Sequence, residues 1–344
     1  MEVVLTDRIG ELFLTAYQGA WPSQEFMSFA RRRRVGGVIL FADNCPDHQR
    51  LSEALALIHK QQEAGALVAI DQEGGRVCRL KGAPAEYRAA GAYAKMAGGG
   101  ESAKDEALAA YAGEFSAAAR YMAELGINLL LGPVCDLALW RGDTALEGRT
   151  FGASPHPAAE FVTETVRLCH QAGLTCCLKH APGLGRVCVD PHRTLGESPM
   201  TLEEFRTVDS VPFRAGISAG ADSLMTSHFV AREFDDSPVT FSKTTVEILV
   251  REALSENLAL LSDDLSMGAL AEFGSPGKIA CRALAAGHDL LLTRDHRAAE
   301  AGISAIEAAL ESGAIPRQRI LQALGNVERL KERALGVDQR GNPQ

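Results

Sequence analysis

Acid and imidazole side chains gather in two short stretches of this sequence. Asp190 and His192 lie two residues apart, and Asp263 and Asp264 follow the apolar run that begins at Leu258. A carboxylate can hydrogen-bond one nitrogen of an imidazole, which fixes the tautomer and leaves the other nitrogen to transfer a proton. With a second carboxylate fixed at a strand end, such a histidine suffices for a two-step displacement at a sugar carbon. The alternative, slightly favoured by the spacing of the first pair alone, is an aspartate that caps a turn beside an exposed histidine.

The two adjacent aspartates are expected to point in different directions. Asp263 ends a predicted strand and is a candidate nucleophile facing inward, whereas strand alternation turns Asp264 to the other side, where it can cap the next helix. Asp136 and His228 are further polar residues at strand ends. We expect His228 to pack or to support the site indirectly.

Three charged residues elsewhere are candidate ligand-binding groups. Asp71 follows the apolar run 66–70 and precedes a pair of glycines that allow a sharp turn, although it can equally cap that turn. Arg79 can swing back toward the same strand end. Arg149 lies in a long loop, where a guanidinium can donate two parallel hydrogen bonds to a carboxylate or a hydroxyl pair. Taken alone, an arginine there is more often an ordinary surface residue.

Lys179 and His180 follow the strand-like run 174–178. Both are polar donors at a strand end and suit the binding of hydroxyl groups, although a histidine in such a place can also be purely structural. Lys179 raises a different hypothesis, because a lysine on a barrel strand can form a Schiff base with a carbonyl substrate. That chemistry requires a desolvated lysine whose pKa is lowered.

The elements that must position these residues alternate along the chain. Short apolar runs predict eight strands, at 11–17, 36–41, 66–70, 127–132, 174–178, 222–226, 258–262 and 288–293. Helical periodicity predicts helices at 24–33, 47–63, 102–124, 157–172, 201–219, 243–255, 276–286, 296–312 and 316–334. Parallel strands need crossover connections, so this order predicts an α/β fold, a single (β/α)8 TIM-like barrel with extra C-terminal helices. An open doubly wound sheet is the alternative, because a strand count does not prove closure.

We expect one catalytic barrel domain over 1–336 and a frayed tail at 337–344. The long irregular stretches 74–100, 133–156 and 181–200 each follow a predicted strand. In a barrel they therefore emerge at the carboxyl end, where such folds carry their chemistry.

Composition bounds the class of protein. The 344 residues are 46% apolar and carry a formal net charge of −9, which is ordinary for a globular protein and argues against nonspecific nucleic-acid binding. The sequence has no apolar run near the roughly 20 residues that span a bilayer and no visible secretory signal. We therefore expect a cytoplasmic protein with no membrane partner. It also lacks HExxH, P-loop and strand-linked GxGxxG motifs, so no metal or cofactor is expected.

Six motifs occur in a definite order. They are Gly36-Gly37-Val38-Ile39-Leu40-Phe41, Asp71-Gln72-Glu73-Gly74-Gly75-Arg76-Val77, Gly148-Arg149-Thr150-Phe151-Gly152, Lys179-His180, Asp190-Pro191-His192 and Ser262-Asp263-Asp264-Leu265-Ser266-Met267. Together they resemble the glycoside hydrolase family 3 β-N-acetylhexosaminidases, of the cytoplasmic type that bacteria use to recycle cell-wall fragments. The resemblance covers residues 10–295 and implies a TIM-like catalytic barrel, in agreement with the strand count.

This resemblance implies a retaining exo-β-N-acetylglucosaminidase that acts on peptidoglycan-derived fragments. The sequence leaves the oligomeric state open, and a monomer is favoured. Asp263 would be the nucleophile that forms a glycosyl-enzyme intermediate, and His192, oriented by Asp190, would serve as acid and then as base. The N-acetylglucosamine in the −1 subsite would be bound by Asp71, Arg79, Arg149, Lys179 and His180. The Lys-His pair points to an N-acetylated sugar rather than glucose.

The chain departs from the family pattern in two of these motifs. Where the family reads Lys-His-Phe-Pro-Gly-His-Gly, this chain has Ala181 and Leu184, and where the family reads Asp-Ser-His it has Pro191. Proline fixes its own φ and restricts the preceding residue. We expect these changes to alter rate and specificity more than the class of reaction.

Other functions fit parts of the pattern. A β-N-acetylglucosaminide phosphorylase of the same family is one, because a neutral histidine repels phosphate less than a second carboxylate does, and a β-glucosidase is another. A Schiff-base lyase that uses Lys179 belongs to a different class of enzyme. A barrel that binds muropeptide fragments without cleaving them is the non-catalytic alternative.

Overall fold

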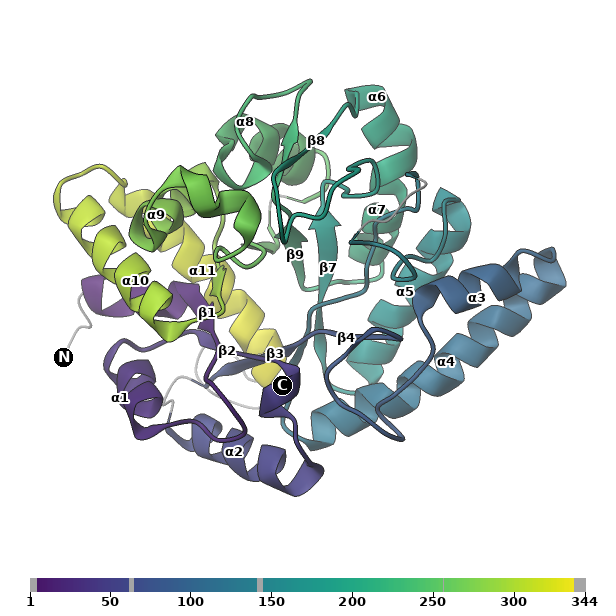
Figure 1. Cartoon of the computed structure of the whole chain (residues 1–344), viewed down its shortest axis with the longest axis horizontal. Coiled ribbons are helices and arrows are strands. Elements are labelled where there is room, and N and C mark those ends of the chain that lie inside the picture. The colour runs from purple at the N-terminus through teal and green to yellow at the C-terminus, as the bar shows by residue number, and fades with distance from the viewer. Residues whose placement is uncertain (1–4, 62–64, 141–144, 256, 337–344) are drawn as a thin grey trace.

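The computed structural model describes residues 5–61, 65–140, 145–255 and 257–336, and within them eight parallel strands form one sheet (Figure 1). The strand order is β11-β9-β7-β6-β3-β2-β1-β12. The bounds are β1 Phe13–Thr15, β2 Gly37–Leu40, β3 Leu67–Ile70, β6 Leu129–Leu130, β7 Thr175–Ala181, β9 Ser223–Thr226, β11 Ala259–Leu261 and β12 Leu291–Thr293. All eight are buried along their length and overlap the predicted strands, because parallel strands covered on both faces read as short apolar runs.

The two ends of this sheet meet and close a barrel. Leu261 of β11 forms a parallel bridge with Leu290, just before β12. Ser262 N donates to Leu290 O at 3.0 Å, and Leu265 N donates to Leu292 O at 2.9 Å. Since β12 also pairs with β1, the predicted (β/α)8 barrel is confirmed and the open doubly wound sheet is excluded.

Helices between the strands form an outer ring around the barrel (Figure 1). Their bounds are α1 Gln24–Arg32, α2 His48–Gln61, α3 Ala90–Ala97, α4 Glu101–Glu124, α5 Pro155–Gln171, α6 Leu202–Glu204, α7 Ser210–Ser218, α8 Lys243–Thr245, α9 Pro276–Ala286, α10 His296–Glu311 and α11 Arg317–Leu335. The π-helical segments Phe205–Asp209 and Val246–Glu252 continue α6 and α8, so the predicted helices 201–219 and 243–255 exist with mixed helical geometry.

The predicted irregular stretches contain structure that local patterns did not reveal. The stretch 74–100 completes a small antiparallel hairpin of β4 Gln72–Gly74 with β5 Val77–Cys78 and includes α3, which packs along α4 (Figure 1). β8 Gly196–Ser198, in the stretch 181–200, pairs in parallel with β10 Phe229–Ala231. Strands of two or three residues are too short to show a period of alternation.

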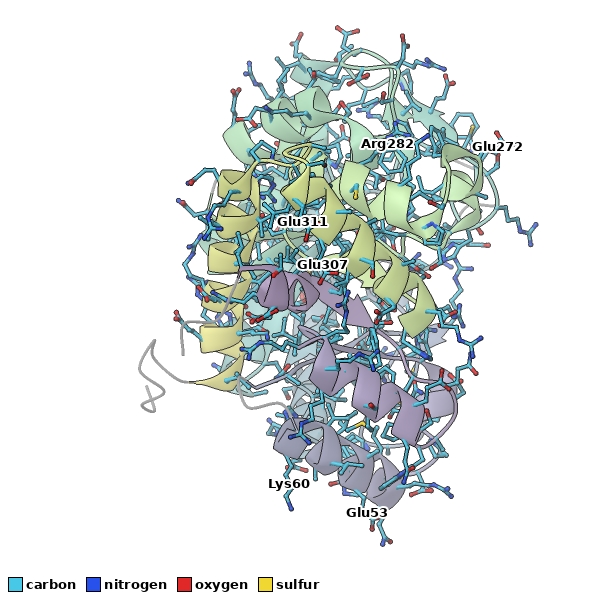
Figure 2. All side chains as sticks on the ribbon, turned by 90° about the vertical axis from the view of Figure 1, so that its left-hand side faces the viewer. Glu53, Lys60, Glu272, Arg282, Glu307 and Glu311 are labelled. Atoms are coloured by element: carbon cyan, nitrogen blue, oxygen red, sulfur yellow. The ribbon has the colours of Figure 1, made fainter. Side chains whose placement is uncertain are left out.

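The first and last elements of the chain lie together on one side of the molecule. A 3-10 helix, Leu5–Leu12, precedes β1, so the strand predicted at 11–17 begins two residues too early. Arg33, directly after α1, donates to Glu307 of α10 at 2.9 Å, and Figure 2 shows Glu307 beside the purple N-terminal segment.

No helix in the described part of the chain combines the length and apolarity needed to cross a bilayer. The tail predicted to fray, 337–344, lies outside the described residues.

Candidate active site

A cavity of about 190 Å³ lies at the carboxyl end of the barrel. Its wall is built by residues at the ends of β3, β7, β9, β11 and β12, which is where TIM-like barrels carry their chemistry. Seven of the eight predicted site residues line it, namely Asp71, Arg79, Arg149, Lys179, His180, His192 and Asp263. The eighth, Asp190, is bonded to His192. Residues that are far apart in the sequence therefore meet at one site.

Buried charges form one wall of the cavity. Lys179 Nζ lies 2.7 Å from Asp71 Oδ1 and 2.6 Å from Glu73 Oε1. Arg149 donates twice to Glu73, from Nε at 2.7 Å and from Nη2 at 2.8 Å, so the bidentate bonding suggested for a ligand is made to Glu73 here. Arg79 Nη2 lies 3.2 Å from the second oxygen of Asp71. The binding residues are thus held in fixed positions by one another.

This ion cluster sets the protonation state of Lys179. Burial acts to lower the pKa of the ammonium, but Asp71 and Glu73 outweigh burial and raise the pKa above its ordinary value. Burial likewise acts to raise the pKa of Glu73, but Arg149 and Lys179 hold that pKa well below its usual range. A Schiff-base lysine must instead be easy to deprotonate. The Schiff-base interpretation of Lys179 is therefore disfavoured by the structure.

His180 is oriented by a buried carboxylate on the neighbouring strand end. Its Nδ1 lies 2.6 Å from Asp136 Oδ2, which also accepts from His180 N at 3.1 Å. A carboxylate can only accept, so Nδ1 carries the hydrogen and Nε2 is left for other partners. Asp136 Oδ1 accepts from Leu184 N at 2.7 Å. One carboxylate thereby orients His180 and also fixes the start of the 181–200 loop.

Asp190 and His192 form the pair that their spacing suggested. Asp190 Oδ1 accepts from His192 N at 3.0 Å and lies 2.7 Å from His192 Nδ1. These hydrogen bonds outweigh the effect of burial and lower the pKa of Asp190. Nε2 is therefore the ring nitrogen that remains available for proton transfer, and His192 lines the cavity.

The two aspartates after β11 do not diverge as strand alternation predicted. β11 ends at Leu261, and both Asp263 and Asp264 line the cavity. Asp264 Oδ1 accepts from Ser266 N at 2.9 Å and from Arg294 N at 3.2 Å, so it stabilises the turn rather than capping the next helix. Burial raises the pKa of Asp264. The prediction was wrong because alternation no longer holds once the chain has left the strand.

The buried side chain of His228 hydrogen-bonds to the backbone of this turn. Its Nε2 lies 3.0 Å from Asp264 O and its Nδ1 lies 2.6 Å from Thr240 Oγ1. Burial lowers the pKa of His228, so the neutral ring donates to the carbonyl and accepts from the hydroxyl. The structural role expected for His228 fits these contacts.

Two cavity residues carry buried polar atoms that have no hydrogen-bond partner within the described structure. They are the hydroxyl of Ser227 and Nε of Arg79. Ser227 directly follows β9, and Met225 of that strand also lines the cavity. Unsatisfied buried polar groups are costly, so their presence at one cavity fits a site that receives a polar ligand.

Glu73 and Asp136 belong to the site, but the sequence did not predict a role for either residue. Glu73 stands inside the motif that contains Asp71, but its partners, Arg149 and Lys179, lie 76 and 106 residues away. For Asp136 the sequence gives one clue to a place in the site. It is a carboxylate that follows the fourth barrel strand, at the same end of the barrel as the other site residues. Contacts between distant strand ends follow from barrel closure, which local sequence patterns do not encode.

A closed parallel barrel with paired carboxylates and oriented histidines at its carboxyl end defines a barrel enzyme of the glycoside hydrolase class. The family model described as "Glycosyl hydrolase family 3 N terminal domain" matches residues 4–330. The chain belongs to glycoside hydrolase family 3.

Proteins similar to this chain carry consistent names. A β-hexosaminidase of Xanthomonas oryzae pv. oryzae is 33% identical over 286 residues, which cover 82% of this chain and 83% of that protein. A β-hexosaminidase of Tolumonas auensis is 33% identical over 298 residues, 86% of each chain. Among solved structures, a family 3 β-N-acetylglucosaminidase from Paenibacillus sp. superposes with a TM-score of 0.87 at 28% identity. That match covers 99% of this chain and 66% of the Paenibacillus chain.

The fold is shared with more distant structures as well. NagZ from Neisseria gonorrhoeae, solved in complex with N-trifluoroacetyl-D-glucosamine, superposes with a TM-score of 0.80 at 24% identity. The match covers 95% of this chain and 93% of that protein. This similarity extends the agreement in fold along nearly the whole of both chains.

Proposed function

We propose that this chain is a retaining exo-β-N-acetylglucosaminidase that removes terminal N-acetylglucosamine from peptidoglycan-derived fragments in the cytoplasm. The observation that carries the proposal is the single cavity that brings Asp263 and the Asp190-bound His192 together with the Lys179 ion cluster. A nucleophile, a proton-transfer group and a rigid polar subsite are the three parts that such a reaction needs.

In the first step Asp263 attacks the anomeric carbon, while Nε2–H of His192 protonates the departing glycosidic oxygen. The C1–O bond to the leaving group breaks as the bond from C1 to the Asp263 carboxylate forms. In the second step the now neutral His192 takes a proton from water, and the water oxygen displaces Asp263 from C1. Two inversions at C1 give net retention. Asp190 remains ionised and stabilises the imidazolium form of His192 between transfers.

The shape and polarity of the cavity support removal of a terminal sugar. Apolar side chains that include Ile39, Leu131 and Met225 line its barrel side, and a packed barrel interior offers no passage for a continuing chain. The charged wall of Asp71 and Lys179 suits ring hydroxyls. The names of the two β-hexosaminidases and the N-acylated glucosamine bound by NagZ support an N-acetylated substrate.

The test is hydrolysis of 4-nitrophenyl N-acetyl-β-D-glucosaminide and of the corresponding glucoside, with and without phosphate. The wild type should cleave the N-acetylated substrate alone, and Asp263→Ala should lower kcat/KM by roughly 1,000-fold or more. Asp105→Ala, which removes an exposed carboxylate on α4, is the matched control and should act as the wild type.

Each other outcome selects a different function. Release that depends on phosphate and yields sugar 1-phosphate would replace the hydrolase by a phosphorylase. Preference for the glucoside would make the protein a β-glucosidase. A wild type that binds muropeptides, cleaves neither substrate and is unaffected by Asp263→Ala would make it a binding protein.

A further inference from the structure

The acid–base pair of the proposed mechanism stands on an exposed turn. The side chain of His192 is 64% exposed and that of Asp190 is 37% exposed. Arg193 N and Thr194 N both donate to Asp190 O, at 3.0 and 3.2 Å, so residues 190–194 form one compact turn. Since the imidazole is not packed on most sides, its position depends on where the backbone of this turn rests.

The turn rests on the first residues of a 3-10 helix, Gly268–Phe273, that follows the nucleophile. Ala269 N donates to Pro191 O at 3.2 Å. A Cβ at Gly268 would lie 2.7 Å from His192 O and 3.0 Å from Arg193 O, whereas ordinary carbon contacts there lie at 3.4–4 Å. Two loops that are far apart in the sequence therefore approach each other closely through their backbones.

Close approach, rather than an unusual backbone angle, is what requires glycine at position 268. Its φ lies outside the left-handed region, so an alanine fits the local backbone conformation. The atoms nearest to such a methyl group belong to the backbone carbonyls of His192 and Arg193. A substitution at Gly268 thus acts on the turn that carries His192, not on its own helix.

The surface that receives the turn is itself fixed to the nucleophile. Gly268 follows Asp263 by five residues in the same loop. Leu265 N is bonded to Leu292 O of β12, and Asp264 Oδ1 accepts from Ser266 N. A short, hydrogen-bonded segment of backbone therefore connects Asp263 to the surface under His192.

We propose that Gly268 is a positioning residue that sets the distance of His192 from the reacting bond by letting the acid–base turn sit directly on the nucleophile loop. This inference rests on the proposed glycosidase mechanism. To reach ordinary contact distance from a methyl group at 268, the carbonyl of His192 would have to move by about 0.7 Å and that of Arg193 by about 0.4 Å. Displacements of that size in a proton-transfer group lower rates by roughly 10- to 100-fold.

The test compares two leaving groups in Gly268→Ala, His192→Ala and the wild type. A nitrophenolate departs with little help from an acid, whereas an alkyl alkoxide needs protonation. For Gly268→Ala, kcat/KM should fall roughly 10- to 100-fold on an alkyl N-acetyl-β-glucosaminide and less than about threefold on the 4-nitrophenyl substrate. Azide, an anionic nucleophile that needs no base, should speed turnover of the nitrophenyl substrate in both variants by attacking C1 and displacing Asp263.

The matched control is Gly113→Ala. Gly113 lies on α4, and a Cβ there meets nothing within 4 Å. This variant should therefore keep the wild-type ratio of kcat/KM between the two substrates. The positioning role is wrong if Gly268→Ala lowers kcat/KM equally on both substrates and azide does not restore turnover. It is also wrong if the variant keeps the wild-type ratio of kcat/KM between the two substrates. If His192→Ala itself keeps the wild-type ratio, the proposed mechanism fails instead.

A second variant covers the case in which Gly268→Ala does not fold. Ala269→Pro removes the N–H that donates to Pro191 O, and proline is tolerated in the first turn of a helix. This variant should show the same selective loss on the alkyl substrate and the same azide rescue. If Ala269→Pro folds and keeps the wild-type ratio of kcat/KM on the two substrates, the contact between this turn and the start of the 3-10 helix does not position His192.

Discussion

Two cations and two carboxylates lie buried against one another in the cavity wall, namely Lys179, Arg149, Asp71 and Glu73. Each of these four has a hydrogen-bonded partner of opposite charge, and Arg79 adds a third cation beside Asp71. Removal of one member leaves a buried charge without compensation, which is costly. The cluster is therefore a rigid unit, and the predicted binding residues are best regarded as parts of it rather than as separate ligand contacts.

Asp136 affords the sharpest test at the level of a single residue. It accepts three hydrogen bonds, two from His180 and one from Leu184. In Asp136→Asn one of these donors faces the amide NH2, so a donor meets a donor. We expect the free energy of unfolding to fall by about 1–3 kcal/mol and kcat/KM to fall about tenfold or more, because His180 loses its orientation. Urea denaturation and steady-state kinetics measure the two effects.

Asp222 provides a matched control at the other end of the barrel. Its Oδ2 accepts from Cys176 N at 2.9 Å and lies 3.0 Å from His170 Nε2, so it too is a buried aspartate paired with a histidine. Asp222→Asn should lose comparable stability and keep its activity per folded molecule. If both variants lose activity alike, Asp136 has only a structural role.

Among the elements, the 181–200 loop is tied to the helix that follows it. Arg186 Nε lies 3.1 Å from Asp209 Oδ2, and Arg186 Nη1 lies 2.9 Å from Glu204 Oε1. Burial raises the pKa of Asp209 to about 6, despite the opposing effect of Arg186. A carboxyl with a raised pKa stabilises the fold fully at low pH, and this contribution is lost as pH rises through the folded-state pKa.

Asp209→Asn should therefore change the pH dependence of stability. The difference in unfolding free energy, wild type minus variant, should decrease by up to about 3 kcal/mol between pH 4 and pH 7. Denaturation at a series of pH values measures this difference and cancels the groups that the two proteins share. A difference that stays flat or increases with pH would show that the Asp209 pKa is not raised.

The sequence predicted the elements of the barrel better than the short segments between them. Strands such as Leu67–Ile70 and helices such as Glu101–Glu124 carry strong local patterns of apolar residues. The β4–β5 hairpin and α3 were missed, because tertiary contacts rather than local periodicity stabilise them. The same limit applies to the site. Strand-end residues were recognisable, but the pairing of Lys179 with Asp71, 108 residues away, follows only from closure of the barrel.

At the level of the whole molecule, the C-terminal helix α11 is locked to the amino end of the barrel through Asp289. This fully buried carboxylate accepts from Arg251 Nη2 at 2.7 Å, Arg319 Nη2 at 2.6 Å and Asn326 Nδ2 at 2.8 Å. Arg319 and Asn326 belong to α11. The extra C-terminal helix thus secures the strand that completes the barrel.

Asp289→Ala should destabilise the protein by about 3–5 kcal/mol, because it removes the carboxylate that compensates the buried guanidinium groups of Arg251 and Arg319. Urea denaturation measures the loss, and activity per folded molecule should be unchanged because the network lies opposite the cavity. Asp236→Ala, which removes a carboxylate that is 91% exposed, is the control and should change stability by no more than about 0.5 kcal/mol. Equal stability of the two variants would contradict the role of the network.

The closure of the sheet has a consequence for synthesis of the chain. β1 must wait for β12 as its partner, and Thr15 and Thr293, which face each other across that pair, are separated by 278 residues. Until the ribosome has released β12, β1 and β11 each keep an open edge, and such edges promote aggregation. Contacts of this range also slow folding. The carboxyl end of the barrel that carries the cavity is therefore complete only after β12 has been synthesised and has paired with β1.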